Sequence, residues 1–259
     1  MRLDSSIAAV VTGGASGLGL GSVRALRAAG VQVAIFDRNP ETGEKMAAET
    51  GSLFCQADVM SDESLDAAFA KARAAHGQER ILISCAGGGN AHTTIRKDKE
   101  TGQIKVFPTA DFIRVLNLNA AGTFATITRF AAGVAELELI DGERGAIVCT
   151  ASTAAQDGQM GQAAYSAGKA AIIGMTLPIA RDLSRYGIRI NTILPGIFDT
   201  PAMAGATPAM LEGLGATVLF PKRLGAPAEY ASLALELVRN TYFNAESIRL
   251  DGGIRMAVR

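Results

Sequence analysis

Three residues near the middle of the chain have the types and spacing needed for proton transfer: Ser152, Tyr165 and Lys169. Tyr165 and Lys169 are four residues apart, so a helix would place both side chains on one face. A lysine cation beside a phenol stabilises the phenolate and lowers a tyrosine pKa that is ordinarily near ~10. Ser152 follows an apolar run at residues 146–149, which predicts a buried parallel strand. A neutral donor, a tunable acid and a fixed cation suit proton transfer at a carbonyl or alcohol oxygen, although a buried tyrosine with ordinary helix neighbours would show the same spacing.

The composition excludes several other classes of protein. The 259 residues are 48% hydrophobic with 29 glycines, which is enough for a sizeable core with many tight turns. A formal net charge of +0 and the lack of a membrane-spanning apolar run give no reason to expect binding to nucleic acid or insertion into a membrane. Three cysteines without a close pair and only two histidines indicate buried thiols and no metal site. The N-terminus leads directly into a predicted strand without a recognisable targeting peptide, so we expect a cytoplasmic protein.

A glycine-rich turn near the N-terminus predicts a phosphate-binding loop. The turn follows the apolar run 7–11, carries a Gly-x-x-x-Gly-x-Gly pattern at Gly13, Gly17 and Gly19, and precedes a helix-like stretch. Glycines let the backbone approach a pyrophosphate, and the N–H groups at the start of a helix favour its negative charge. A tight strand–helix turn without a ligand would use the same glycines, so the prediction also depends on the element that follows.

The next predicted strand, residues 31–36, ends at Asp37. An acidic residue about twenty residues after the glycine loop can bind the adenosine ribose hydroxyls and repel a 2′-phosphate. Ser16, inside the loop, brings no positive charge to offset that repulsion, whereas Arg38 could in principle receive a phosphate. These residues predict NAD rather than NADP as the cofactor.

Strands and helices alternate along the whole chain, which predicts an α/β fold: a single-domain, Rossmann-type, doubly wound parallel sheet of about seven strands with helices on both faces. Ligands of such sheets bind at the carboxyl ends of the strands. At the end of the third predicted strand, Asp58 can accept a hydrogen bond from the adenine amino group while Val59 packs on the ring. Alternatively, Asp58 simply opens the next turn.

Two segments depart from the alternating pattern. Residues 93–107 form a basic, polar insertion that could fold as a hairpin with Thr101 and Gly102 in its turn. This insertion is either a solvated excursion or a cationic surface for the phosphates of a large substrate. Residues 200–222 are rich in Ala, Met, Gly and Pro without strong periodicity, and we expect them to form a mobile substrate lid. Since no linker or repeat is evident, residues 1–259 are predicted to form one NAD-binding domain.

The assembled pattern resembles the short-chain dehydrogenase/reductase family along essentially the whole chain. Three motifs carry the resemblance in order and spacing, namely the glycine loop 12–19, Ser152 with Tyr165-x-x-x-Lys169, and Pro195-Gly196. The resemblance implies that Tyr165 is the general acid/base and that Ser152 holds the substrate oxygen. It also implies that Lys169 binds the nicotinamide ribose and lowers the tyrosine pKa.

The same resemblance implies further site residues. Asn119, on a helix predicted from about residue 110, would hold a water in the proton relay. The fourth strand ends in Ser84-Cys85-Ala86-Gly87 where the family usually has Asn-Asn-Ala-Gly, which changes a strand-end contact without removing a catalytic group. The residues expected to contact the cofactor are Gly13, Ser16, Gly17, Leu18, Gly19, Asp37, Asp58, Val59, Cys85, Ala86, Gly87, Tyr165, Lys169, Pro195, Ile197, Phe198 and Thr200.

A closer resemblance is to one subgroup, the type-2 3-hydroxyacyl-CoA dehydrogenases, also called 17β-hydroxysteroid dehydrogenase type 10. It rests on residues 158–165, 174–183 and 248–252, and on the place of the inserted segment. It implies NAD-dependent oxidation of 3-hydroxyacyl-CoA thioesters. Gln159 or Gln162 could then orient the second oxygen of the substrate, although each is equally plausible as a packing residue.

Several alternatives stay open at this point. A secondary-alcohol or hydroxysteroid dehydrogenase would use the apolar residues of 198–220 as its lid. A 3-oxoacyl carrier-protein reductase is disfavoured because Asp37 repels the phosphate of NADPH. A non-catalytic scaffold has no physical need for an intact Ser, Tyr, Lys and Asn set. The family resemblance further implies a homotetramer, assembled through the helices of Asn119 and Tyr165 and the C-terminal strand.

Overall fold

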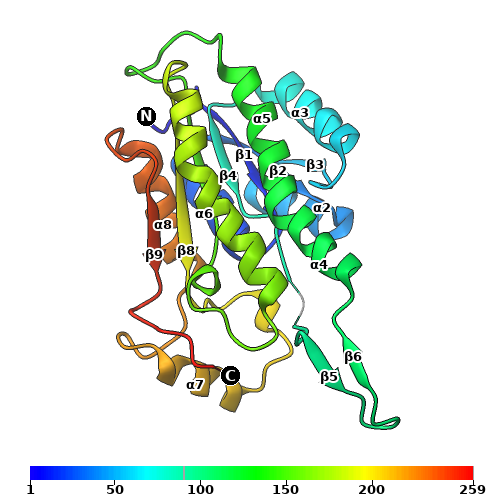
Figure 1. Cartoon of the computed structure of the whole chain (residues 1–259). Helices are drawn as coiled ribbons and strands as arrows, with labels where there is room; N and C mark the ends of the chain where they lie inside the picture. The colour runs from blue at the N-terminus through cyan, green and yellow to red at the C-terminus, as the bar shows by residue number, and fades with distance from the viewer. Residues whose placement is uncertain (90, 259) are drawn as a thin grey trace.

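A seven-stranded parallel sheet lies at the centre of the molecule (Figure 1). In spatial order its strands are β3 (Leu53–Gln56), β2 (Gln32–Asp37), β1 (Ala8–Thr12), β4 (Ile81–Ser84), β7 (Gly145–Thr150), β8 (Ile188–Pro195) and β9 (Ser247–Leu250). The structure is a computed structural model that describes residues 1–89 and 91–258. The chain reverses its direction of winding between β1 and β4, where doubly wound sheets bind their ligands. The predicted Rossmann-type α/β fold is confirmed.

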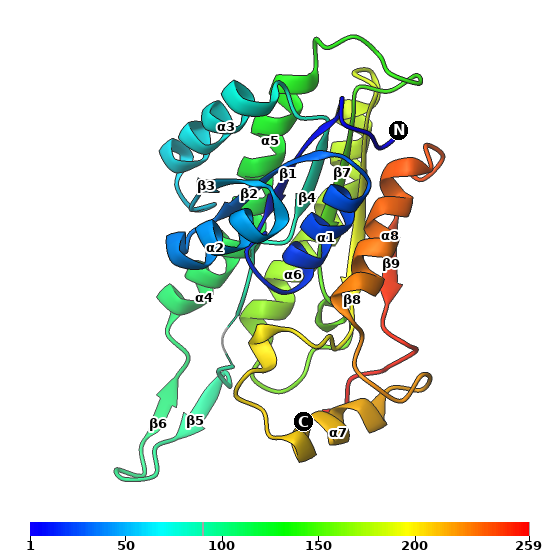
Figure 2. The same ribbon diagram turned by 180° about the vertical axis from the view of Figure 1, so that it is seen from behind.

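Helices cover both faces of this sheet (Figure 2). One face carries α1 (Gly17–Ala28), α2 (Pro40–Thr50) and α8 (Pro227–Arg239). The other carries α3 (Asp62–His76), α5 (Gly122–Val134) and α6 (Ala163–Ser184). Among the described residues, no helix combines the length and the apolar character needed to cross a bilayer.

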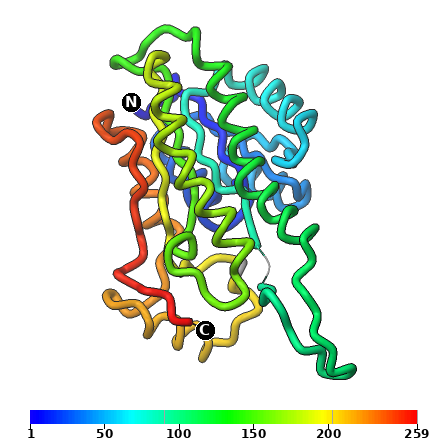
Figure 3. Tube along the Cα trace, in the orientation of Figure 1, coloured from blue at the N-terminus to red at the C-terminus, as the bar shows by residue number. Residues whose placement is uncertain are grey.

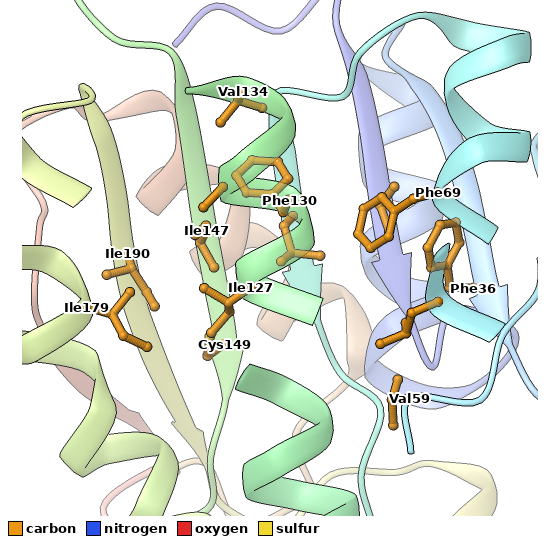
Figure 4. Packing of buried hydrophobic residues seen from close by; sticks show 14 of the residues in the cluster. Phe36, Val59, Phe69, Ile127, Phe130, Val134, Ile147, Cys149, Ile179 and Ile190 are labelled. Atoms are coloured by element: carbon orange, nitrogen blue, oxygen red, sulfur yellow. The ribbon is translucent and has the colours of Figure 1, made fainter. Parts of the chain in front are cut away.

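Each face of the sheet has its own hydrophobic layer because the strands are apolar on both sides. Figure 4 shows the layer beneath α3, α5 and α6, where Phe69 of α3 meets Phe36 of β2 and Phe130 of α5 lies over Ile147 of β7. The rings of Phe36 and Phe69 pack edge to face with their centroids 5.0 Å apart. Burial of each such ring contributes about 1.5–3 kcal/mol, so this layer holds the strand ends in a fixed arrangement.

The inserted segment 93–107 folds as a hairpin, as the sequence suggests. Its strands β5 (Ile95–Lys97) and β6 (Ile104–Val106) pair antiparallel, and Gly102 adopts a positive φ in the turn. The hairpin projects away from the body of the molecule (Figure 3), and the residues of both strands are exposed.

Two helical segments differ from the sequence predictions. The helix expected from about residue 110 to 135 is divided into α4 (Thr109–Leu116), a π-helical turn (Asn117–Ala121) and α5. Within 200–222, where the sequence shows no strong periodicity, the chain forms the regular helix α7 (Pro208–Thr217), and the lid role of this segment stays a prediction. The side chain of Thr207 caps α7 by accepting a hydrogen bond from the Met210 N–H, and Pro208 occupies the first helical position. Four of the ten residues of α7 are alanine or glycine, so its apolar stripe is weak in the sequence.

Candidate active site

The glycine loop between β1 and α1 forms a cradle in which backbone atoms, rather than side chains, face one another. Gly13 and Gly17 have positive φ values of 62° and 52°, which glycine adopts without strain. A Cβ added at Gly19 would lie 2.2 Å from the Gly13 carbonyl oxygen, so no side chain fits there. Leu18 turns away from the loop and packs against the hydrophobic layer beneath α1. This backbone surface at the start of a helix fits the pyrophosphate of a dinucleotide.

A cleft of about 520 Å³ continues from the loop to the end of β2. Ser16, Gly17 and Asp37 line it together, as the sequence predicts for an adenosine site. The Asp37 carboxylate accepts hydrogen bonds from the Ala15 N–H (3.2 Å) and the Asn39 N–H (3.1 Å), which orient it beside the loop.

The cleft also contains a cation that the sequence analysis missed, Arg24, which is ion-paired with Glu49 at 2.6 Å. Gly17, Leu20, Gly21 and Arg24 all line the cleft. They recur at helical spacing along α1, and this spacing was the available signal.

Asp58 and Val59 follow β3 at the same edge of the sheet. The Asp58 N–H donates to Ser64 Oγ (2.9 Å), and Asp58 Oδ1 accepts from the Met60 N–H (2.9 Å). These contacts match the alternative in which Asp58 opens the next turn. Val59 is buried against α5, because a Cβ added at Gly122 would lie 2.8 Å from Val59 Cγ2. The adenine contact of both residues stays a prediction.

Ser152, Tyr165 and Lys169 come together at the carboxyl end of β7. Tyr165 and Lys169 lie one turn apart on α6, and the Ser152 hydroxyl is near enough to the Tyr165 phenol to lower its pKa. Ser152 Oγ also accepts from the Ala154 N–H (3.1 Å), which begins a short 3₁₀ turn and fixes the serine at the end of the strand. The arrangement predicted from the spacing is therefore present.

The electrostatics of this group differ from the prediction. Burial raises the pKa of Tyr165, and the neighbouring Ser152 hydroxyl partly opposes that rise. Lys169 Nζ instead donates to the Thr150 carbonyl oxygen (2.8 Å) and lies 6.0 Å from the centroid of the Tyr165 ring. Burial lowers the pKa of Lys169 to about 8, against the opposing influence of the thiols of Cys85 and Cys149. The expected fall of the Tyr165 pKa beside Lys169 is thus absent here, because the cation is turned towards the strand end.

Asn119 is fully buried in the π-helical turn, a feature that frequently marks functional positions. Its amide nitrogen donates to the carbonyl oxygens of Gly88 (2.7 Å) and Val115 (2.9 Å), and its oxygen accepts from the Gly88 N–H (3.2 Å). A Cβ added at Gly87 would lie 2.7 Å from Asn119 Oδ1 and 2.9 Å from Lys169 Nζ. Asn119, Gly87 and Lys169 therefore meet at one point, and the water-holding role of Asn119 stays a prediction.

The altered end of β4 is held by hydroxyl groups that the sequence analysis did not identify. The N–H groups of Cys85 and Ala86 both donate to Thr12 Oγ1 (3.1 Å each). Thr150 Oγ1 donates to the Ser84 carbonyl oxygen (2.7 Å). Thr12 and Thr150 are the last residues of β1 and β7. Thr12 opens the glycine loop and Thr150 lies two residues before Ser152, and these positions were the available signal.

Behind these strand ends, the phenol of Tyr230 is hydrogen-bonded to Thr150 Oγ1 (2.7 Å). Tyr230 is completely buried beneath the sheet and belongs to α8. No sequence motif marks this tyrosine.

The segment after β8 returns to the glycine loop. Pro195 ends the strand, the Ile197 carbonyl oxygen accepts from the Gly225 N–H (2.9 Å), and Phe198 is buried against Gly225. A Cβ added at Gly17 would lie 3.4 Å from the side chain of Thr200. Two segments that are far apart in the sequence and were both predicted to contact the cofactor therefore lie side by side.

The predicted substrate residues Gln159 and Gln162 contact each other. The Gln159 N–H donates to Gln162 Oε1 (2.9 Å), and Gln159 Nε2 donates to the Ala257 carbonyl oxygen (3.0 Å). Both side chains thus have structural partners, and contact with substrate stays a prediction.

Known proteins are similar to this chain over nearly its full length. The family model for short chain dehydrogenase matches residues 7–210. The 3-hydroxyacyl-CoA dehydrogenase type-2 of Drosophila melanogaster is 45% identical over 95% of this chain and 96% of the relative. The crystal structure of 3-hydroxyacyl-CoA dehydrogenase type-2 from Mycobacterium avium is 40% identical, with a TM-score of 0.92 and 98% of both chains covered.

A more distant structure matches as well. It is a 7α-hydroxysteroid dehydrogenase complexed with NADH and 7-oxo glycochenodeoxycholic acid, with a TM-score of 0.87, 26% identity, and coverage of 100% of this chain and 97% of that chain. The comparisons confirm the resemblance drawn from the sequence and support a nicotinamide cofactor.

Proposed function

The chain belongs to the short-chain dehydrogenase family, and we propose that it interconverts 3-hydroxyacyl-CoA and 3-oxoacyl-CoA with NAD as the cofactor. The observation that carries this proposal is the proximity of the Ser152 hydroxyl to the Tyr165 phenol at the carboxyl end of β7, the same edge of the sheet as the glycine cradle after β1. Relatives at 45% and 40% identity that bear the name 3-hydroxyacyl-CoA dehydrogenase type-2 support the substrate class.

In the oxidative direction, the Tyr165 phenolate accepts the proton of the substrate hydroxyl as general base. The Ser152 hydroxyl donates a hydrogen bond to the same oxygen and holds it as it becomes a carbonyl. When bound, the nicotinamide supplies the hydride acceptor. The buried Lys169 and Asn119 lie directly behind this pair and are the residues that would pass the proton on. Reduction runs the same proton path in reverse, with Tyr165 as the acid.

The preference for NAD rests on charge at the adenosine end of the cleft. The Asp37 carboxylate faces the place where an NADP phosphate would lie, and repulsion of that phosphate favours NAD. The cation in the cleft, Arg24, is already paired with Glu49, so its charge is partly neutralised.

The hydroxysteroid dehydrogenase alternative is supported by apolar side chains near the lid. Met210, Leu219 and Phe220 expose 57%, 68% and 81% of their surface, an apolar surface that a steroid ring system could cover.

We also propose a homotetramer, since Ile113, Phe124 and Leu177 on α4, α5 and α6 are exposed apolar residues. The three free cysteines support a reducing, cytoplasmic location.

The test is NADH consumption by the purified protein with acetoacetyl-CoA, run in parallel with NADPH and with a steroid ketone. The proposal predicts rapid turnover only with NADH and the thioester. Turnover restricted to the steroid ketone or to NADPH would contradict the substrate or the cofactor assignment. Absence of turnover with every pair would favour a scaffold without chemistry.

A further inference from the structure

The loop 156–162, which joins Ser152 to Tyr165, is covered by the C-terminal segment of the chain. After β9 the chain turns at residues 251–253 and continues as a tail, residues 254–258. Figures 1 and 2 both show this tail ending beside α7, on the side of the molecule where the sheet presents its carboxyl ends. Residues almost a hundred positions apart in the sequence are therefore in contact across the substrate side of the site.

Arg249, near the end of β9, connects the tail to this loop. Its guanidinium donates to Gln156 Oε1 (2.7 Å) and Asp157 Oδ2 (2.7 Å) on the loop. The same guanidinium donates to Asp251 Oδ2 (2.8 Å) and the Ile254 carbonyl oxygen (3.0 Å) on the turn and tail. Only 19% of the Arg249 side chain is exposed, so these charge-assisted bonds are partly shielded from water.

The backbone of the tail makes a second connection. The Met160 N–H donates to the Val258 carbonyl oxygen (3.0 Å), and Gln159 Nε2 donates to the Ala257 carbonyl oxygen (3.0 Å). On the other side of the loop 156–162, the Gly161 carbonyl oxygen accepts a hydrogen bond from the His92 N–H (2.9 Å) at the base of the hairpin. The loop is therefore held between the hairpin base and the tail.

The turn that precedes the tail also contacts the end of the lid. The Phe220 N–H donates to the Gly252 carbonyl oxygen (3.2 Å), and a Cβ added at Gly252 would lie 2.5 Å from Val218 Cγ1. A Cβ added at Gly196 would lie 2.7 Å from Asp251 Cβ, which places the turn against the segment that follows β8. One stretch of chain thus joins the loop before Tyr165 to the end of the lid.

We propose that Arg249 and the tail 254–258 position the loop 156–162 and so set the affinity of the enzyme for its acyl substrate. The proposal rests on the proposed function for the identity of that substrate. A loop of this kind loses backbone entropy when it is ordered, and the bonds from Arg249 and the tail offset that cost. Arg249 and the tail 254–258 together are called the strap below. Among the described residues that line the adenosine cleft around Asp37, none comes from 249–258, so we expect loss of the strap to change substrate affinity more than NADH affinity.

Hydrogen exchange of the NADH-bound enzyme measures the strap without any substrate. Arg249→Gln removes the bonds to the loop, so amides in the peptide 156–162 should exchange at least about tenfold faster while those of α6 beyond Gly168 stay unchanged. Arg255→Gln is the matched control, because Arg255 is 67% exposed and its recorded partners are Asp251 and Ile254 rather than the loop. Equal exchange in Arg249→Gln and wild type would overturn the proposal.

Kinetics with acetoacetyl-CoA then test the link to substrate affinity. Arg249→Gln and Asp157→Asn should each raise KM about tenfold and leave the Kd of NADH within twofold, and the double variant should be no worse than either alone. Arg249→Lys retains the charge but not the fork, and it should give an intermediate KM. Faster exchange with an unchanged KM would overturn the claim about substrate affinity.

Two further arms keep these outcomes distinct. If wild type does not reduce acetoacetyl-CoA, the proposed function fails, and the exchange experiment still decides whether the strap exists. If Arg249→Gln does not fold, Asp157→Asn and removal of residues 256–259 remove the same connection from its other ends, and unchanged exchange in both would overturn the proposal.

Discussion

The phenol of Tyr165 lies in surroundings that raise its pKa through burial, and the neighbouring Ser152 hydroxyl lowers that pKa. The balance between these two effects sets the pH at which Tyr165 can act as a base. Lys169 is spatially close but donates to the Thr150 carbonyl oxygen. At the scale of single residues, Ser152 therefore lowers the pKa of Tyr165 in addition to its proposed contact with the substrate oxygen.

Replacing Ser152 with alanine should raise the pH at which the oxidation rate reaches half of its maximum. The serine hydroxyl lowers the pKa of Tyr165, so its loss raises that pKa, and a higher pH is needed to form the phenolate. A hydrogen bond to a charged group contributes about 1.5–3 kcal/mol, which corresponds to a displacement of about 1–2 pH units. The measurement is the pH profile of kcat for oxidation.

Ser166→Ala is the matched control for this experiment. The Ser166 hydroxyl is buried on α6, directly after Tyr165, and has no hydrogen-bond partner among the described residues. Its profile should coincide with that of wild type. A Ser152→Ala profile that also coincides with wild type would contradict the account.

The buried Lys169 should make stability depend on pH. Its pKa is about 8 in the folded chain and ordinarily 10.5, so between these values the folded lysine releases its proton while the unfolded lysine keeps it. The unfolded state then binds more protons, and the free energy of unfolding rises with pH over this window, by about 3 kcal/mol. Lys169→Met removes this rise, and urea unfolding from pH 7 to 10.5 measures the difference. Lys45→Met, at an exposed lysine, should retain the rise of the free energy of unfolding with pH. The same pH dependence of that free energy in wild type and Lys169→Met would refute the prediction.

At the scale of elements, the sequence predicted most of what positions the site. Runs of apolar residues identify the strands because burial on both faces leaves no polar alternation, and the glycine pattern identifies the turn after β1. The π-helical turn at Asn119 was not predictable, since it depends on how α4 and the turn itself pack against α6. The orientation of Lys169 was not predictable either, because spacing places a side chain on a face but does not choose its partner.

The glycine loop gives a test at this scale. In Gly19→Ala the added methyl group meets the Gly13 carbonyl oxygen, so the loop must distort. Such overpacking costs about 1–3 kcal/mol, which should weaken NADH binding by about 5- to 150-fold. Fluorescence titration with NADH measures the change.

The control for Gly19→Ala lies in α6. Nothing lies within 4 Å of a Cβ added at Gly174, so Gly174→Ala should leave NADH binding unchanged and stabilise the helix by about 0.5–1 kcal/mol. Equal NADH affinity in Gly19→Ala and Gly174→Ala would contradict the assignment of the loop.

At the scale of the whole molecule, a buried ion pair joins the start of β8 to the segment that precedes β7. Arg189 Nε contacts Glu143 Oε2 at 2.7 Å, and the same guanidinium donates to the carbonyl oxygens of Leu237, Val238 and Phe243. Arg189→Met removes one donor from each of these acceptors and leaves Glu143 with the Met1 amino group as its partner, so the free energy of unfolding should fall by about 3 kcal/mol. Urea unfolding checks this value, with the exposed Arg181→Met expected within about 0.5 kcal/mol of wild type. A loss below about 1 kcal/mol in Arg189→Met would show that the pair contributes little.

The central claim is that Tyr165 is the acid and base of an NAD-linked dehydrogenase, and Tyr165→Phe tests it most directly. The variant lacks only the phenol oxygen, so NADH should still bind with near wild-type affinity. The account predicts a fall in kcat with acetoacetyl-CoA and NADH of about 10²–10⁴-fold, the usual loss when a general acid is removed. Retention of more than about a tenth of the wild-type kcat would contradict it.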